Sequence, residues 1–236
     1  MKSEASNKSL GGIRILQGLS ADDLDALRKR CAWRRFSVGQ QIVGHQDDTH
    51  DVCFVVSGHV RVIIYSLSGK EVTFRDIASG EIFGELAAID GERRSASVIA
   101  LSDTLIASIT ASEFWDVLRT YPLVWETTLK RLTGYVRDLS ERVFEFSTLA
   151  VKNRIHAELL RLAQDYMRGE NWAQISPAPT HADIASRVST HREAVTRELS
   201  ELSHAGLVER VSGTLIVRDV RQLQKMVDEV LGNANR

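Results

Sequence analysis

The sequence of 236 residues has little of what marks several specialised classes of protein. Only three prolines accompany 43% hydrophobic residues, which excludes a collagen-like chain and argues against disorder over most of the length. The two cysteines, Cys31 and Cys53, belong to no C-x-x-C or Cys/His cluster, so neither a zinc nor an iron–sulfur site is indicated, and both thiols are expected to be buried. Apolar runs of 18 residues are missing, and Met1–Gly12 lacks the apolar centre of a signal peptide. We therefore expect a cytoplasmic globular protein with no membrane partner.

The chain also lacks an excess of charge of either sign. Its 30 basic and 31 acidic side chains give a formal net charge of −1, and residues 151–236 alone carry 12 basic and 11 acidic side chains. Composition therefore gives no indication of a nucleic-acid partner. If this chain does bind DNA, non-specific binding should be weak at physiological salt, and affinity should depend mainly on base contacts.

β-Branched residues dominate short segments between about Phe36 and Thr110. Turn signals at Ser57–Gly58, Ser68–Gly69 and Ser79–Gly80 separate some of them, a spacing typical of an antiparallel barrel or sandwich. The predicted strands span 52–56, 60–65, 71–77, 97–99 and 105–109. A compact β-roll is the simplest fold that accommodates them.

A helical pattern follows, starting at Tyr121–Pro122, because proline is tolerated in a first helical turn. Apolar residues then recur three and four positions apart with charged residues between them, as in a coiled coil. The pattern predicts a helix over about 122–147 that forms a homodimer interface. The alternative is a helix packed on its own β-roll. The predicted interface residues are Leu129, Leu132, Val136, Leu139, Val143 and Phe146.

The sequence predicts a domain boundary directly after this helix. A short junction at Ser147–Ala150 precedes a second helix over about 152–167. The expected domains are therefore 1–147 and 148–236.

Two short helices joined by a tight turn at Ser189 are predicted next. Thr180 with Asp183 forms a capping-box pattern, and Thr190 with Glu193 repeats it. Two helices in this arrangement are what a helix-turn-helix requires. After them, segments 207–211 and 215–217 flank a turn at 212–214, which predicts the hairpin wing of a winged helix. A last helix follows Asp219, and the sequence assigns it no role.

The second of these helices would carry polar residues on the face opposite its apolar stripe. Arginine can bind guanine through two hydrogen bonds, and glutamate can accept from the amino group of cytosine. The alternative is a solvated amphipathic helix on which Glu193 serves only as a cap. The residues of this face are Arg192, Glu193, Thr196, Arg197 and Ser200.

From about Phe36 to Val217 the chain resembles the CRP/FNR family of bacterial transcription regulators. The motif Arg192-Glu193-x-Val195-x-Arg197 is similar to the signature of that family's DNA-reading helix. The resemblance implies an α+β fold with an N-terminal cyclic-nucleotide-binding β-roll (jelly-roll-like), a long dimerisation helix and a C-terminal winged helix-turn-helix. It implies a homodimer that reads inverted-repeat half-sites similar to TGTGA in double-stranded DNA, with RNA polymerase as a candidate partner. The candidate DNA-binding residues are Thr180, His191, Arg192, Glu193, Thr196 and Arg197.

A second motif, the segment 84–96, is similar to the phosphate-binding cassette of cyclic-nucleotide-binding domains. The resemblance assigns Glu85 to the ribose 2′-hydroxyl and Arg94 to the cyclic phosphate, while Arg93 is expected to face solvent. Taken alone, the pattern would also fit an ion pair on an ordinary surface turn. The supporting ligand-binding residues implied by the resemblance are Gly84, Leu86, Ser95 and Ala96.

The sequence leaves the effector open. The positions that match the family's adenine-contacting pair are Leu139 and Ser140, and leucine cannot form a hydrogen bond with a base, so only Ser140 remains a candidate ligand contact. Cyclic AMP, cyclic GMP, another effector or none all stay possible, and no resident cofactor is expected. From a different class, a β-roll could be a metal-dependent cupin enzyme. Because the seven histidines form no His-x-His set, we expect no metal site, no catalytic residues and no enzyme activity.

Overall fold

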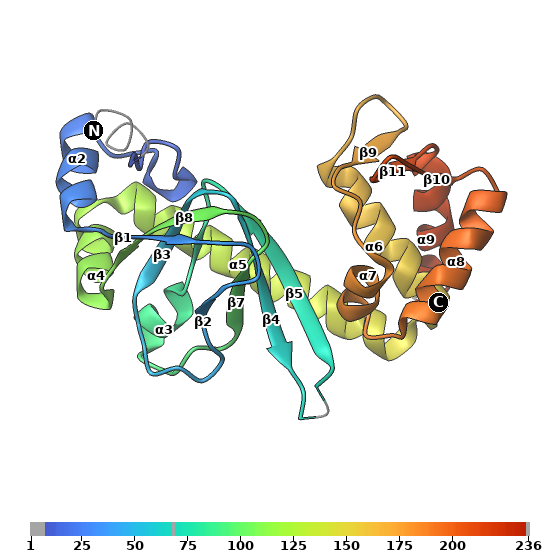
Figure 1. Cartoon of the computed structure of the whole chain (residues 1–236), viewed down its shortest axis with the longest axis horizontal. Coiled ribbons are helices and arrows are strands. Elements are labelled where there is room, and N and C mark those ends of the chain that lie inside the picture. The colour runs from blue at the N-terminus through green and yellow to red at the C-terminus, as the bar shows by residue number, and fades with distance from the viewer. Residues whose placement is uncertain (1–7, 68, 235–236) are drawn as a thin grey trace. The chain divides into compact units, whose positions relative to one another are not determined.

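The computed structural model describes residues 8–67 and 69–234 (Figure 1). The chain divides into two compact units, Met1–Tyr135 and Val136–Arg236, and this division falls inside the long helix. The boundary expected between residues 147 and 148 stays a prediction. Ser68 of the predicted turn at Ser68–Gly69 and the first part of Met1–Gly12 lie outside the described residues, whereas Gly69 is described and has a φ of 78°. Within the described ranges, no helix is both long and apolar enough to cross a membrane.

The first unit contains two antiparallel sheets, with strand orders β1-β8-β3-β6 and β2-β7-β4-β5 (Figure 1). All the strands predicted for this region are confirmed, with ends that differ by one residue or none. The elements are η1 (Arg14–Leu16), α2 (Ala21–Arg30), β1 (Ala32–Phe36), β2 (Gln41–Val43), β3 (Val52–Ser57), β4 (His59–Tyr65), β5 (Glu71–Ala78), β6 (Ile82–Phe83), α3 (Glu85–Asp90), β7 (Ser97–Ala100), β8 (Thr104–Ile109), α4 (Ala111–Thr120) and the start of α5 (Pro122–Thr148).

Strand β3 runs through the middle of this unit and is buried on both faces. Val52 and Phe54 belong to the core formed with helices α2 and α4, whereas Val55 belongs to the core between the sheets. Successive side chains of a strand point to opposite faces, so this continuous apolar segment serves both cores. Cys53 is buried as predicted, while Cys31 is only partly buried.

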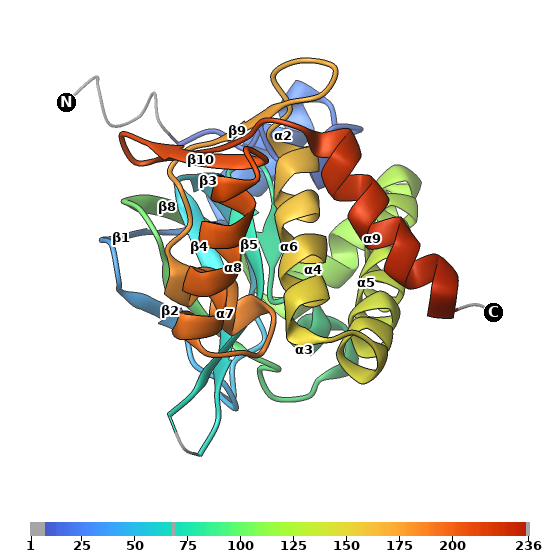
Figure 2. The ribbon, with the colours of Figure 1, turned by 90° about the vertical axis from the view of Figure 1, so that its right-hand side faces the viewer.

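The second unit is a winged helix whose core residues come from α6, the three short strands and helices α7 to α9 (Figure 2). The strand order β10-β11-β9 places the predicted wing, β10 and β11, against a third strand from the loop after α6. The last helix packs against α6. The elements are α6 (Val151–Asp165), β9 (Ala173–Ile175), α7 (His181–Arg187), α8 (Arg192–His204), β10 (Val208–Val211), β11 (Thr214–Val217) and α9 (Val220–Ala234).

The helix ends of this unit confirm one predicted capping box and contradict the other. At α7, the Thr180 hydroxyl accepts from the Asp183 backbone N–H, and the Asp183 carboxylate accepts from the Thr180 backbone N–H. At α8 the prediction was wrong: His191 is the N-cap, and no side chain caps the helix. The backbone N–H of Thr190 donates to Ala185 O at 3.0 Å, so Thr190 closes the turn after α7 instead of starting α8.

Candidate ligand pocket and DNA-reading helix

The cassette begins at a glycine that no other residue could replace without strain. Gly84 joins β6 to α3 with φ of 85°, in the left-handed region that favours glycine. A Cβ added here would lie 2.4 Å from Nη1 of Arg94 and 2.7 Å from Asp51 O. The turn is therefore shaped around the guanidinium of Arg94.

Arg94 is buried, with 3% of its surface exposed, and its guanidinium is held in place on three sides. Nε donates to the Thr49 hydroxyl at 2.9 Å, Nη1 to Gly84 O at 3.1 Å and Nη2 to Asp51 O at 2.8 Å. Each terminal nitrogen carries a second N–H, so two donors remain for an anion. Sequence reasoning missed Thr49 and Asp51, because only the fold brings residues some 45 positions away to this side chain.

Glu85, the first residue of α3, is 2% exposed. Its Oε1 lies 3.7 Å from Nη2 of Arg75, and its Oε2 has no hydrogen-bond partner among the described residues. A buried carboxylate oxygen without a donor costs free energy. Glu85 therefore presents a buried acceptor that a ligand hydroxyl could satisfy.

The other predicted ligand residues lie in less enclosed positions. Ala96 is partly buried, whereas Leu86 and Ser95 are exposed. Arg93, which was expected to face solvent, is exposed as well. Ser140 belongs to the second unit, is exposed, and donates its hydroxyl to Val136 O at 2.8 Å. The structure thus places Gly84 in contact with Arg94, with Glu85 next in the chain, and ligand contacts by all of these residues stay predictions.

Two side chains near Glu85 were not found from the sequence. The guanidinium carbon of Arg75, on β5, lies 3.8 Å from the ring centroid of Tyr135, on α5. The hydroxyl of Tyr135 is buried and has no partner among the described residues. Burial, and to a smaller extent the charge of Glu85, raises the pKa of Tyr135. No motif signals these residues, because they lie on different elements 60 positions apart.

The apolar seam predicted along α5 is largely exposed in the chain taken alone. Leu132 is partly buried, whereas the other five seam residues expose between 37% and 64% of their surface. A row of large exposed apolar residues on one helix marks an interaction surface. The exposed residues are Leu129, Val136, Leu139, Val143 and Phe146.

Helix α8 has the two faces that the sequence predicted. Val195, Leu199 and Leu202 are buried in the core of the second unit. The opposite face borders a shallow, open hollow, and all the residues that line it are exposed: Arg192, Glu193, Thr196, Arg197 and Ser200. Of the other two candidate DNA contacts, His191 is exposed and Thr180 is engaged in its capping box.

His181 connects the start of α7 to this face. Its Nδ1 lies 2.7 Å from the Thr196 hydroxyl, which itself donates to Arg192 O at 3.0 Å. Since the hydroxyl has one proton, the imidazole must be the donor to it. Burial, followed by the charges of Arg210 and Arg192, lowers the pKa of His181. Thr196 is therefore fixed in orientation before any DNA arrives.

The described residues contain no group of three or more His, Cys, Asp or Glu side chains placed to hold a metal ion. The chemistry of the two sites is instead that of hydrogen bonding and charge. The first unit offers a buried guanidinium and a buried carboxylate at the two ends of one short motif. The second offers a row of exposed polar side chains on one helix.

Comparison with protein families matches both units. Residues 33–121 match the model of the cyclic nucleotide-binding domain, and residues 153–226 match that of the Crp-like helix-turn-helix domain. The chain is 28% identical over 215 residues to the cyclic AMP receptor protein of Thermus thermophilus, covering 91% of this chain and 97% of that protein. It is 28% identical over 204 residues to the cAMP-activated global regulator Vfr of Pseudomonas aeruginosa, covering 84% and 94% respectively.

Among solved structures, a variant of CooA from Carboxydothermus hydrogenoformans superposes with a TM-score of 0.79 at 21% identity, covering 90% of this chain and 95% of that chain. The c-di-GMP responsive regulator CLP of Xanthomonas campestris gives a TM-score of 0.71 at 20% identity, covering 84% and 99%. At these identities the likeness shows a shared fold. It confirms the predicted combination of a β-roll, a long helix and a winged helix-turn-helix.

Proposed function

Because the chain belongs to the CRP/FNR family of transcription regulators, we propose that it is a homodimeric, sequence-specific DNA-binding regulator controlled by cyclic AMP or cyclic GMP. The observation that carries nucleotide control is that Glu85, at the start of α3, and Arg94, in the loop after it, are both buried within one short motif. The names of two relatives, a cyclic AMP receptor protein and a cAMP-activated regulator, support the same effector class.

In the nucleotide site, Arg94 would bind the cyclic phosphate and Glu85 the ribose 2′-hydroxyl. A planar guanidinium held by three hydrogen bonds presents its remaining donors in a fixed direction, which suits a phosphate with two exposed oxygens. The ribose hydroxyl would donate to Oε2 of Glu85, which has no partner among the described residues. The ligand would therefore satisfy polar groups that the fold has already buried.

In the DNA site, the N-terminal half of α8 would enter the major groove. Arg192 and Arg197 would each bind a guanine and Glu193 a cytosine, consistent with half-sites similar to TGTGA. Two copies of the helix, one from each protomer, would read an inverted repeat whose half-sites lie about one DNA turn apart. We propose RNA polymerase as a candidate further partner.

The dimer would form along the α5 seam. Burying these side chains against a second copy removes the apolar surface that one chain exposes. Leu139→Glu would place a charge in the middle of the seam and should convert the dimer to monomer. Sedimentation velocity at micromolar concentration measures this, with Ser140→Glu on the neighbouring helix position as the control.

The decisive experiment titrates the purified protein with cyclic AMP and then cyclic GMP in a calorimeter. The same samples are then tested for operator affinity in a fixed salt buffer, by fluorescence anisotropy of a duplex with inverted TGTGA half-sites and of a scrambled duplex. We expect one nucleotide to bind and to raise affinity for the first duplex only. By linkage, the operator should raise nucleotide affinity by the same factor.

Two adjacent arginines provide the matched variants. Arg94→Lys keeps the charge but loses the forked donor geometry, so nucleotide binding should fall sharply, whereas Arg93→Lys on the exposed neighbour should leave it unchanged. If neither nucleotide binds the wild type, nucleotide control is wrong, and the alternative of another effector or none takes its place. The proposal of specific binding to the inverted repeat does not depend on that result.

A further inference from the structure

The strongest unexplained feature outside the assigned contacts is a pair of buried polar atoms on either side of Arg75. Oε2 of Glu85 and the hydroxyl of Tyr135 both lack a hydrogen-bond partner among the described residues. Arg75 touches both side chains, with Nη2 3.7 Å from the Glu85 carboxylate and the guanidinium carbon 3.8 Å from the Tyr135 ring centroid. The three groups therefore form one cluster within the first unit.

Packing alone does not explain a tyrosine at this position. The contact with Arg75 uses the face of the aromatic ring, and a phenylalanine would provide the same face. The hydroxyl adds only a buried polar group without a partner, which destabilises the protein unless something else binds to it. A ligand is the simplest source of that partner.

The two atoms specify the chemistry of the group that would fill the cluster. A carboxylate oxygen such as Oε2 of Glu85 accepts a hydrogen bond. Burial, followed by the charge of Glu85, raises the pKa of Tyr135, which keeps the phenol protonated and able to donate. An alcohol hydroxyl can donate one hydrogen bond and accept another at the same time. A ligand hydroxyl therefore has the hydrogen-bonding capacity to match both residues.

We propose that Tyr135 is the residue of the long helix that recognises the ligand, donating to the same hydroxyl that Glu85 accepts from. This inference rests on the proposed nucleotide site, where the hydroxyl is the ribose 2′-hydroxyl. Tyr135 would then be the ligand contact on the long helix, for which the sequence suggested Ser140. The Ser140 hydroxyl is exposed and donates to a carbonyl of its own helix. Arg75 positions the ring and neutralises part of the Glu85 charge.

The position of Tyr135 also links the ligand to dimerisation. The residue lies on α5 between Leu132 and Val136, two residues of the predicted seam. A ligand held by Tyr135 would restrict the helix that carries the interface. Removing the hydroxyl should therefore weaken both nucleotide binding and the gain in operator affinity that the nucleotide causes.

The test is Tyr135→Phe, which removes one oxygen and keeps the ring against Arg75. Calorimetric affinity for the bound cyclic nucleotide should fall about tenfold, as for the loss of one buried hydrogen bond. The 2′-deoxy form of that nucleotide should bind wild type and variant within about twofold of each other, because its missing hydroxyl removes the same interaction. Tyr65→Phe on the exposed hairpin is the matched control and should bind both ligands like wild type.

A measurement without ligand separates recognition from a structural role. Thermal unfolding of ligand-free Tyr135→Phe should occur at the wild-type temperature or above it, since the variant loses a hydroxyl that has no partner. A lower unfolding temperature would make Tyr135 a packing residue and overturn the proposal. So would equal affinity of variant and wild type for the ribonucleotide. If the wild type binds neither cyclic nucleotide, the proposed function fails first and this inference fails with it.

Discussion

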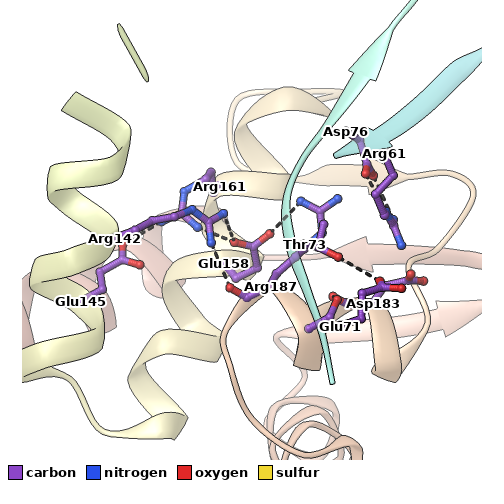
Figure 3. Close-up of polar contacts among 11 residues, drawn as sticks. Arg61, Glu71, Thr73, Asp76, Arg142, Glu145, Glu158, Arg161, Asp183 and Arg187 are labelled. Carbon is purple, nitrogen blue, oxygen red and sulfur yellow. Dashed lines mark hydrogen bonds and ion pairs between the residues drawn. The ribbon is translucent and has the colours of Figure 1, made fainter. Parts of the chain in front are cut away.

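The two least exposed glutamates among the described residues lie in different units of the molecule and have opposite surroundings. Glu85 in the first unit is 2% exposed and has one guanidinium at 3.7 Å. Glu158 in the second unit is 1% exposed and lies among three arginines, with Arg142 at 3.2 Å and Arg187 at 3.3 Å. Figure 3 shows this cluster, in which Arg161 pairs with Glu158 and also with Glu145.

The different surroundings of Glu85 and Glu158 show that burial of a charge does not by itself indicate a ligand site. Both carboxylate oxygens of Glu158 accept hydrogen bonds from arginines, and these bonds connect α5, α6 and α7. Arg142 also donates to Arg187 O at 3.0 Å. Burial lowers the pKa of Arg142, and the negative charge of Glu158 opposes that shift. Glu85 instead keeps one oxygen without a partner among the described residues. Unmet hydrogen-bonding capacity, rather than burial, distinguishes the candidate site.

The largest expected effect is on stability when Glu158 is removed. Glu158→Ala leaves three guanidinium groups crowded together without their shared carboxylate, which for a buried ion pair costs about 3–5 kcal/mol. Urea unfolding followed by circular dichroism measures the loss. Glu158→Gln, which keeps the shape and one acceptor, should lose less. A loss below about 1 kcal/mol for Glu158→Ala would show that the cluster is not structural.

The second effect tests whether the cassette is shaped around Arg94. Gly84→Ala adds the strain of a positive φ and a Cβ that would lie 2.4 Å from Arg94 Nη1, so it should cost about 2–4 kcal/mol. Gly91→Ala, at the other end of α3, has a similar φ of 74° but no atom within 4 Å of the added Cβ. It should cost only about 1–2 kcal/mol. Equal losses in the two variants would mean that Arg94 moves freely away from the turn.

The sequence predicted the two helices and the wing of the DNA-binding unit because local signals specify them, such as the Thr180–Asp183 capping box and the apolar spacing of α8. It also predicted Glu85 and Arg94, which lie within one short motif. It could not predict that Thr49 would hold Arg94 or that Arg75 would meet Tyr135. Those contacts depend on strand register and on how α5 packs, which no local pattern encodes.

The same limit explains the error at Thr190. Its hydroxyl and the acid three positions later satisfy the capping pattern, but the preceding helix uses the Thr190 N–H to close its own turn. Two helices separated by so short a turn compete for the same residues. The cluster around Glu158 was missed for a related reason, because its arginines come from three helices.

A smaller change in stability is expected for Glu85→Gln. The amide keeps the side-chain volume and removes a buried charge that has one distant partner, so the free energy of unfolding should change by less than about 1 kcal/mol. Nucleotide affinity should nevertheless fall about 10- to 100-fold, since a charged acceptor for the ligand hydroxyl is lost. Calorimetry and urea unfolding on the same sample separate the two outcomes. A destabilisation as large as that of Glu158→Ala would remove the contrast between the two glutamates.

The smallest expected effect is on the chemical labelling of the two cysteines. The rate of labelling reports whether a substitution disturbs the first unit. Both thiols lie in the first unit, and burial raises the pKa of Cys31 and of Cys53 to about 12. At pH 8 only about one thiol in ten thousand is then a thiolate, the form that reacts with a disulfide reagent, so the native protein should show almost no labelling within minutes. Labelling should rise in Gly84→Ala, whose strain lies beside β3, and stay at the wild-type level in Glu158→Ala, whose damage lies in the second unit. Fast labelling of Glu158→Ala would mean that the two units unfold together. Glu85 and Glu158 would then contribute to the same free energy of unfolding.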